Sequence, residues 1–181
     1  MTQNDVLAVT QPKSKFFVEF MIACLGSCFL ALMSQLAIPL IGTPVPMTLQ
    51  TLAVFLLGGI LGGRRAAYSV IAYLIQGCCA LPVFAGGVAN PLWILSPQAG
   101  FLLSFVAAAF VIGKMIERKP GILYIIGALI LGQLVIFALG MACLSFYVGV
   151  SKACMVGVVP FLSGAVLKIM AGSLAIRFYR K

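Results

Sequence analysis

Long apolar runs separated by short gaps constrain the fold of this chain more than any other feature of its sequence. Hydrophobic residues make up 63% of the 181 residues and charged residues 8%, with a mean hydropathy of +1.19. A helix needs roughly 20 apolar residues to cross a bilayer core of about 30 Å. We therefore predict an all-α membrane protein with six transmembrane helices, at residues 17–40, 47–62, 66–82, 100–114, 121–148 and 161–178.

The N-terminal segment differs in composition from the rest of the chain. Residues 1–15 are polar and are predicted to form a cytoplasmic tail, whereas residues 16–181 are predicted to form a single six-helix transmembrane domain. The first apolar run is long enough to span a membrane and is not followed by a small-residue cleavage site. We therefore expect no removal of a signal peptide.

Basic residues alternate between the gaps and give the expected orientation. The chain has twelve lysine and arginine residues. Ten of them lie before the first apolar run, in every second gap, or at the C-terminus: Lys13, Lys15, Arg64, Arg65, Lys114, Arg118, Lys119, Arg177, Arg180 and Lys181. Only Lys152 lies in the other gaps. The positive-inside rule then places both termini in the cytoplasm of a multi-pass protein of the cell inner (plasma) membrane.

The outward gap at residues 82–100 is uncharged and is broken by proline and glycine, so it is not expected to form a continuous helix. Non-helical backbone at membrane depth persists where protein buries it or where it lines a polar cavity. We predict a loop that lines or caps an outward-facing pocket. A plain extracellular loop is the alternative.

Lys168 lies inside the last apolar run, away from both sets of basic residues. We expect this helix to begin near Ser163 as its N-cap, which places Lys168 less than two turns from the outer end. The chain has three acids, Asp5, Glu19 and Glu117, and none is well placed to pair with Lys168. A charge at the bilayer centre costs about 2.5 to 3.5 kcal/mol on insertion scales. Either the side chain snorkels to water, or a bound small molecule supplies a carboxylate.

Several classes of function have no support in the sequence. The chain has no histidine, and its six cysteines lack the spacing of metal ligands, so neither a metal site nor a cofactor is expected. No nucleophile, base and orienting group converge, which argues against an enzyme. The basic residues are explained by membrane topology rather than by nucleic acid. No G-x-x-x-x-G-K-[ST] motif is present, so transport is either passive or energised by another protein.

The first apolar run carries small residues at a spacing of four, at Ala23, Ser27 and Ala31. Small residues at this spacing allow two helices to approach closely. We predict that this face is a partner interface. Contact with another helix of the same chain is the alternative.

Three stretches together resemble the BioY family, the biotin-specific S components of energy-coupling factor (ECF) transporters. They are TPVPMTLQTLAVFLLGGILGGRRAAYSVIAYLIQGCCALPVFAGG at 43–87, SPQAGFL at 96–102 and VVPFLSGAVLK at 158–168. The resemblance implies six membrane helices, an outward-facing pocket covered by loops, and an energising module of a transmembrane T protein and two ATPases. The small-residue face of the first helix resembles the family's docking surface for the T protein.

The resemblance also implies ligand-binding residues. Lys168 aligns with the family lysine that holds the biotin carboxylate, and Asn90 lies where the family has an asparagine that binds the ureido ring. Ala165 replaces the family aspartate that accepts hydrogen bonds from the ureido ring. Gln50 and Gln98 are further amide candidates, with helix packing and loop hydrogen bonding as their alternative roles.

Aromatic residues on the outward segments are expected to form the apolar walls of the site. They are Phe84, Trp93, Phe101 and Phe161. Trp93 has an alternative role as an anchor at the membrane interface.

The leading hypothesis for function is a membrane subunit that binds biotin and works with an ATP-driven module, or as a stand-alone facilitator. Because Ala165 departs from the family pattern, a second hypothesis keeps the fold and changes the ligand to another small carboxylate, such as lipoate or a biotin precursor. A structural membrane protein without a transport role is the third.

Overall fold

Helices form nearly all of the ordered structure in the computed structural model of this chain. The structure describes the backbone of residues 3–38, 42, 44–119 and 121–180, and side chains from residue 15 onward. Over these ranges there are six long helices and one short one. They are α1 (Gln3–Gln35), α2 (Gln50–Leu61), α3 (Gly63–Cys78), α4 (Ala99–Arg118), α5 (Ile122–Val148), the short α6 (Val150–Gly157) and α7 (Leu162–Tyr179). The predicted all-α fold with six long helices is confirmed.

Four segments of the described chain are long and apolar enough to cross a membrane. They are Lys15–Gln35, Ala99–Arg118, Ile122–Val148 and Val150–Tyr179. The remaining two long helices, α2 and α3, are shorter, and α2 is buried along much of its length by α3, α4 and α7. The chain is therefore a multi-pass membrane protein.

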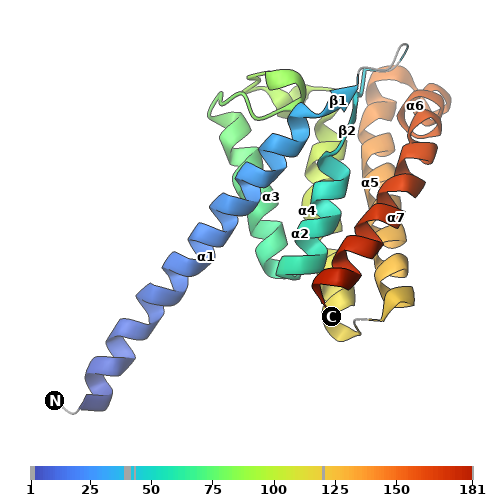
Figure 1. The fold of residues 1–181 in the computed structure, drawn as a ribbon. Helices are drawn as coiled ribbons and strands as arrows, with labels where there is room; N and C mark the ends of the chain where they lie inside the picture. The colour runs from blue at the N-terminus through green and yellow to red at the C-terminus, as the bar shows by residue number, and fades with distance from the viewer. Residues whose placement is uncertain (1–2, 39–41, 43, 120, 181) are drawn as a thin grey trace.

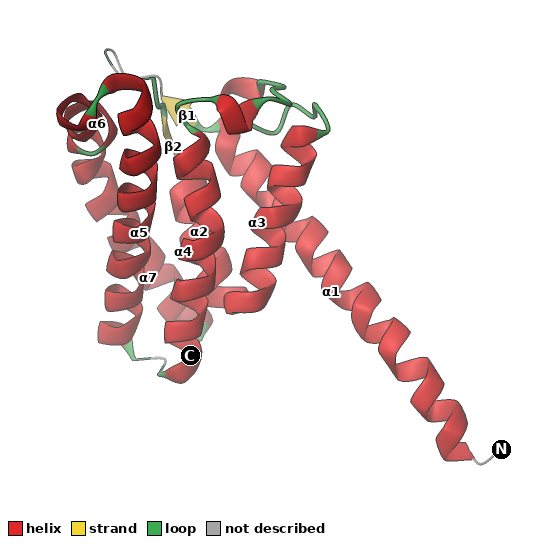
Figure 2. Ribbon diagram, turned by 180° about the vertical axis from the view of Figure 1, so that it is seen from behind, coloured by secondary structure: helices red, strands yellow, loops and turns green. Residues whose placement is uncertain are grey.

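The bundle has two distinct ends. At one end, which we call the loop end, lie the short strands β1 (Ala37–Ile38) and β2 (Met47–Thr48), the 3₁₀ turns η1 (Ala85–Gly87) and η2 (Trp93–Leu95), and α6 (Figure 1). Both termini lie toward the opposite end, the terminal end. Seen from behind, the connection from α3 to α4 crosses the loop end (Figure 2). The predicted irregular segment at 82–100 is thus confirmed as a covering of short turns.

The two acids with described side chains lie at the terminal end and are paired there. Glu19 binds Arg65 at 2.6 Å, and Glu117 binds Lys114 at 2.7 Å. Glu117 also accepts a hydrogen bond of 2.8 Å from the backbone N–H of Gly63, where α3 begins. Both carboxylates therefore form their ion pairs at the terminal end. That this end faces the cytoplasm remains a prediction from the positions of the basic residues.

The first helix differs from its predicted bounds at both ends. It begins at Gln3, so the predicted polar tail continues α1 as a helix that projects away from the bundle in both views (Figures 1 and 2). It ends at Gln35 rather than at residue 40, because the chain then enters β1. Residues Ala37 and Ile38 pair antiparallel with β2, which the apolar pattern did not reveal.

The start of the last helix also corrects the prediction. The helix α7 begins at Leu162, with Phe161 at its N-cap position and no side-chain cap. Ser163 therefore lies inside the first turn and is not the N-cap. The 3₁₀ turn η3 (Val159–Phe161), which contains Pro160, leads directly into α7 and already sets the direction of the chain.

The small-residue face of α1 packs partly within the chain. Ser27 is fully buried, and its hydroxyl accepts a hydrogen bond of 2.9 Å from the amide of Gln76 on α3. Ser27 therefore has the alternative role, which is contact with a helix of the same chain. Ala23 and Ala31 are half-buried. For them the partner interface remains a prediction.

Backbones approach most closely where α4 passes the turn between α2 and α3. A Cβ placed on Gly113 of α4 would collide with the backbone atoms of Gly62 and Gly63. Backbone cannot move aside as a flexible side chain does, so only glycine fits at this crossing. The contact fixes the α2–α3 turn against α4.

We predict that Gly113→Ala destabilises the folded protein by about 1 to 3 kcal/mol, the usual cost of overpacking. The measurement is the fraction of monodisperse protein in detergent after heating at a series of temperatures. Gly127→Ala is the matched control, because a Cβ there meets no atom within 4 Å. Equal thermal stability of the two variants would contradict the proposed packing constraint.

Candidate ligand-binding cavity

A cavity lies among α2, α4, α5 and α7 toward the loop end. It contains about 580 Å³ of space not filled by protein atoms, including a part open to solvent. Fifteen residues line it: Val45, Pro46, Thr48, Gln50, Thr51, Gln98, Phe101, Leu102, Phe105, Gln133, Ile136, Phe137, Phe161, Ala165 and Lys168.

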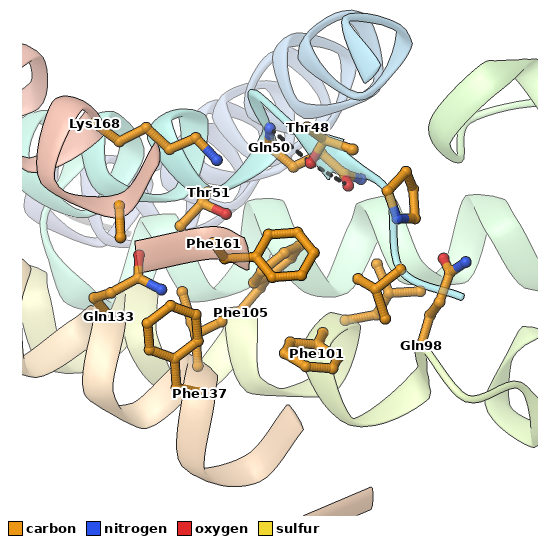
Figure 3. Close-up of a pocket in the computed structure, with 15 residues that line it drawn as sticks. Thr48, Gln50, Thr51, Gln98, Phe101, Phe105, Gln133, Phe137, Phe161 and Lys168 are labelled. Carbon is orange, nitrogen blue, oxygen red and sulfur yellow. Dashed lines mark hydrogen bonds between the residues drawn. The ribbon is translucent and has the colours of Figure 1, made fainter. Parts of the chain in front are cut away.

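Helical spacing brings these side chains to one space. Phe101 and Phe105 are four residues apart on α4, and Gln133 and Phe137 are four apart on α5, so each pair shares one face of its helix. Figure 3 shows these residues and Phe161 around the cavity. The aromatic rings give the cavity a largely apolar wall. Phe161 and Phe101 are thus brought together as predicted, whereas Phe105 and Phe137 were not singled out in the sequence.

Lys168 supplies the positive charge of the cavity. It lies on α7 one turn after Ala165, is half-buried, and points its ammonium toward Gln50 and Thr51 (Figure 3). Within the described part of the chain its Nζ atom has no ion pair and no hydrogen bond to protein. The cavity therefore presents an unpaired cation among apolar side chains.

Gln50 is held in a buried hydrogen-bond network at the start of α2. Its side-chain oxygen accepts a hydrogen bond of 3.0 Å from the hydroxyl of Thr48, and its Nε2 donates to the hydroxyl of Tyr73 on α3. Tyr73 in turn donates to the carbonyl oxygen of Val83 at 3.1 Å. Gln50 is only 4% exposed. The network fixes a polar wall of the cavity to the loop that follows α3.

Gln133 is a polar residue of the cavity that the sequence analysis missed. It lies on α5, is 7% exposed, and its Oε1 atom is buried without a hydrogen-bond partner. The signal was present in the sequence, because Gln133 is the one amide side chain in the apolar run 122–148. Its position next to a cavity rather than in lipid required the structure.

Gln98 connects the cavity to the loop end. It is the N-cap residue of α4, and its Nε2 donates a hydrogen bond of 2.9 Å to the carbonyl oxygen of Pro44. This is the loop-bonding role that the sequence left open as its alternative. Gln98 also lines the cavity.

Three predicted site residues lie in a neighbouring pocket instead. Phe84, Asn90 and Trp93 line a second space that shares only Pro46, Gln98 and Leu102 with the main cavity. The structure therefore does not bring Asn90 into the cavity of Lys168.

Trp93 is not exposed at the membrane interface. It is 3% exposed, and its indole N–H faces the sulfur of Cys78 at 3.2 Å. Its ring lies 5.9 Å from that of Phe84, which meets Tyr73 edge-on at 5.6 Å. These aromatic contacts attach the loop at the end of the bundle to the wall that holds Gln50.

Known proteins resemble this chain in sequence. Residues 7–181 match the BioY family. A protein of Thermotoga maritima named biotin transporter BioY is 36% identical over 132 residues, which are 72% of this chain and 78% of that protein. A Lactococcus lactis protein named biotin transporter BioY2 is 36% identical over 152 residues, which are 81% of each chain.

A solved structure has the same architecture. It is described as the S-component for biotin from an ECF-type ABC transporter, and it matches with a TM-score of 0.80 over 99% of this chain and 94% of that one. The two sequences are 23% identical. This likeness shows the fold.

We predict that Tyr73→Phe lowers the stability of the protein by about 1 to 3 kcal/mol, because it leaves the buried Nε2 atom of Gln50 without an acceptor. Thermal unfolding in detergent measures the change. Tyr147→Phe is the control, since that hydroxyl also donates to a loop carbonyl, of Leu95, but at an exposed position. A Tyr73→Phe variant as stable as the control would contradict a structural role for the network.

Proposed function

Because the chain belongs to the BioY family, we propose that it is the membrane subunit that binds biotin for uptake into the cell. One observation supports the binding role most directly. A single unpaired ammonium, that of Lys168, faces a cavity with four phenylalanine side chains in its wall. Biotin matches this arrangement, since it carries one carboxylate on an aliphatic chain attached to a compact ring system.

We assign Lys168 to the carboxylate of biotin. A carboxylate and an ammonium form a charge-assisted hydrogen bond that is stronger than one between neutral groups. Because the apolar wall excludes much of the water, the attraction is screened less than at an exposed surface. Phe101, Phe105, Phe137 and Phe161 then cover the apolar parts of the ligand.

Other small carboxylates share the charge that Lys168 recognises. Lipoate has the same kind of acidic chain, but its ring has no group that donates a hydrogen bond. The cavity also holds the amides of Gln50, Gln98 and Gln133. These polar groups favour a ligand with a polar head, which biotin and its ureido-containing precursors have and lipoate lacks.

The lining of the cavity includes Thr48 of β2, which lies at the loop end, opposite the terminal end (Figure 1). With the basic residues in the cytoplasm, the cavity faces outward, as a site that captures a vitamin from outside the cell requires. We place the protein in the cell inner membrane with both termini in the cytoplasm.

The chain has no phosphate-binding loop for ATP. We propose that a transmembrane T protein and two ATPases supply the energy, as in ECF transporters. Ala23 and Ala31, which are half-buried on the face of α1 that also carries Ser27, are the proposed docking residues for the T protein. A stand-alone facilitator is the alternative, and uptake measurements separate the two.

We predict that Lys168→Ala weakens biotin binding to the purified protein by at least about 30-fold, because the carboxylate of biotin then lies in the cavity without the ammonium as its counter-ion. The same variant is expected to leave binding of biotinol, in which an alcohol replaces the carboxylate, nearly unchanged. Lys152→Ala is the matched control, since Lys152 is an exposed lysine on α6 outside the cavity.

Two results would contradict this proposal in different ways. Absence of biotin binding by the wild-type protein removes the assigned ligand. Binding by Lys168→Ala with the affinity of Lys152→Ala removes the role of Lys168 while leaving the ligand in place.

We predict that cells without other biotin transporters accumulate radiolabelled biotin above the external concentration only when the T protein and both ATPases are produced with this chain. Accumulation against a gradient requires an energy source, and the sequence carries no phosphate-binding loop for ATP. The complete module with Lys168→Ala serves as the control for binding. Accumulation by the chain alone would contradict the need for these partners.

A further inference from the structure

The polar side chains of the cavity fall into two groups: those that hydrogen-bond to other protein groups and those that do not. Thr48 and Gln50 bond to each other, Gln50 also bonds to Tyr73, and Gln98 bonds to the carbonyl of Pro44. In the described part of the chain, the side chains of Lys168, Thr51 and Gln133 line the cavity and make no hydrogen bond to protein.

Gln133 is more deeply buried than Lys168 and Thr51, the other two side chains without a hydrogen bond. Lys168 and Thr51 are half-buried, whereas Gln133 is 7% exposed and its Oε1 atom is sealed from solvent. A buried polar atom without a partner costs about 1 to 3 kcal/mol. The α5 helix would avoid this cost with a leucine at the same position, so the unsatisfied amide indicates a partner that arrives from outside the protein.

The cavity side of Gln133 is the side from which such a partner can come. Figure 3 shows the Gln133 amide beside Phe137, on the same side of the cavity as Lys168, which lies on the neighbouring helix α7. A primary amide offers one acceptor oxygen and two N–H donors, and a half-turn of its terminal bond exchanges their positions. Its natural complement is a group that carries an N–H next to a C=O.

We propose that Gln133 recognises the cyclic urea of the ligand, accepting a hydrogen bond from a urea N–H and donating one to the urea carbonyl. This inference rests on the proposed function, because biotin supplies the urea. Gln133 then determines specificity at the polar head of the ligand, while Lys168 acts at the carboxylate. The two side chains then recognise two different polar groups of one molecule.

The test compares binding of biotin and of its two singly N-methylated ureas to the purified full chain and to Gln133→Met. In the wild-type protein, methylation of the bonded urea nitrogen is expected to weaken binding about tenfold or more. Gln133→Met is expected to weaken biotin binding about tenfold and to abolish the discrimination against that methylated analogue. Desthiobiotin, which keeps the urea, should lose as much affinity as biotin, and the ratio of biotin to biotinol affinity should not change.

Gln76→Met is the matched control, because it removes an amide that bonds to Ser27 on α1, outside the cavity. It should bind biotin as the wild type does. Gln133→Leu replaces Gln133→Met if the latter does not elute as a monodisperse protein, and the wild-type comparison of analogues needs no variant.

The inference fails if the wild type binds biotin and both methylated ureas equally, or if Gln133→Met binds biotin as Gln76→Met does. It also fails if Gln133→Met keeps the wild-type discrimination between biotin and the methylated ureas. Absence of any biotin binding by the wild type instead rejects the proposed function, so the two failures are distinguishable.

Discussion

A positive charge inside an apolar bundle is the constraint on which the rest of this structure depends. The two described carboxylates, Glu19 and Glu117, are paired with basic residues at the terminal end, so neither neutralises Lys168. Placing such a charge at membrane depth costs about 2.5 to 3.5 kcal/mol on insertion scales. An anionic ligand offsets part of this cost when it binds. The same arrangement excludes cations and favours small acids with apolar bodies, since phenylalanine side chains form much of the wall.

Part of the cavity wall is held in place by contacts within the protein, which lowers the conformational entropy that the protein loses when a ligand binds. Gln50 is fixed by Tyr73, and Tyr73 meets Phe84, which packs on Trp93. Through these contacts the irregular loop at the end of the bundle is joined to the cavity wall. At the other end, the close approach of α4 to the α2–α3 turn sets the distance between two of the helices that surround the cavity.

The sequence predicted the features that follow from composition. Six helices, the irregular covering segment and the unpaired Lys168 all come from where apolar and charged residues stand in the chain. It did not predict the features that depend on which helices become neighbours. Ser27 has the same spacing whether it faces a partner or α3, and Gln133 has the same sequence context whether it faces lipid or a cavity. Ser163 suits an N-cap, but the turn at Pro160 leads into a helix whose N-cap position is Phe161, two residues earlier. Asn90 lies in the expected loop, but that loop directs it to a neighbouring pocket.

We propose that the ligand provides the counter-ion of Lys168. An experimental structure of the protein with biotin bound tests it most directly. We expect a carboxylate oxygen within about 2.7 to 3.2 Å of the Nζ atom of Lys168, with the rings of Phe101 and Phe161 against the ligand. A bound biotin whose carboxylate lies in solvent, with the lysine ammonium turned to water or to another protein group, would contradict it.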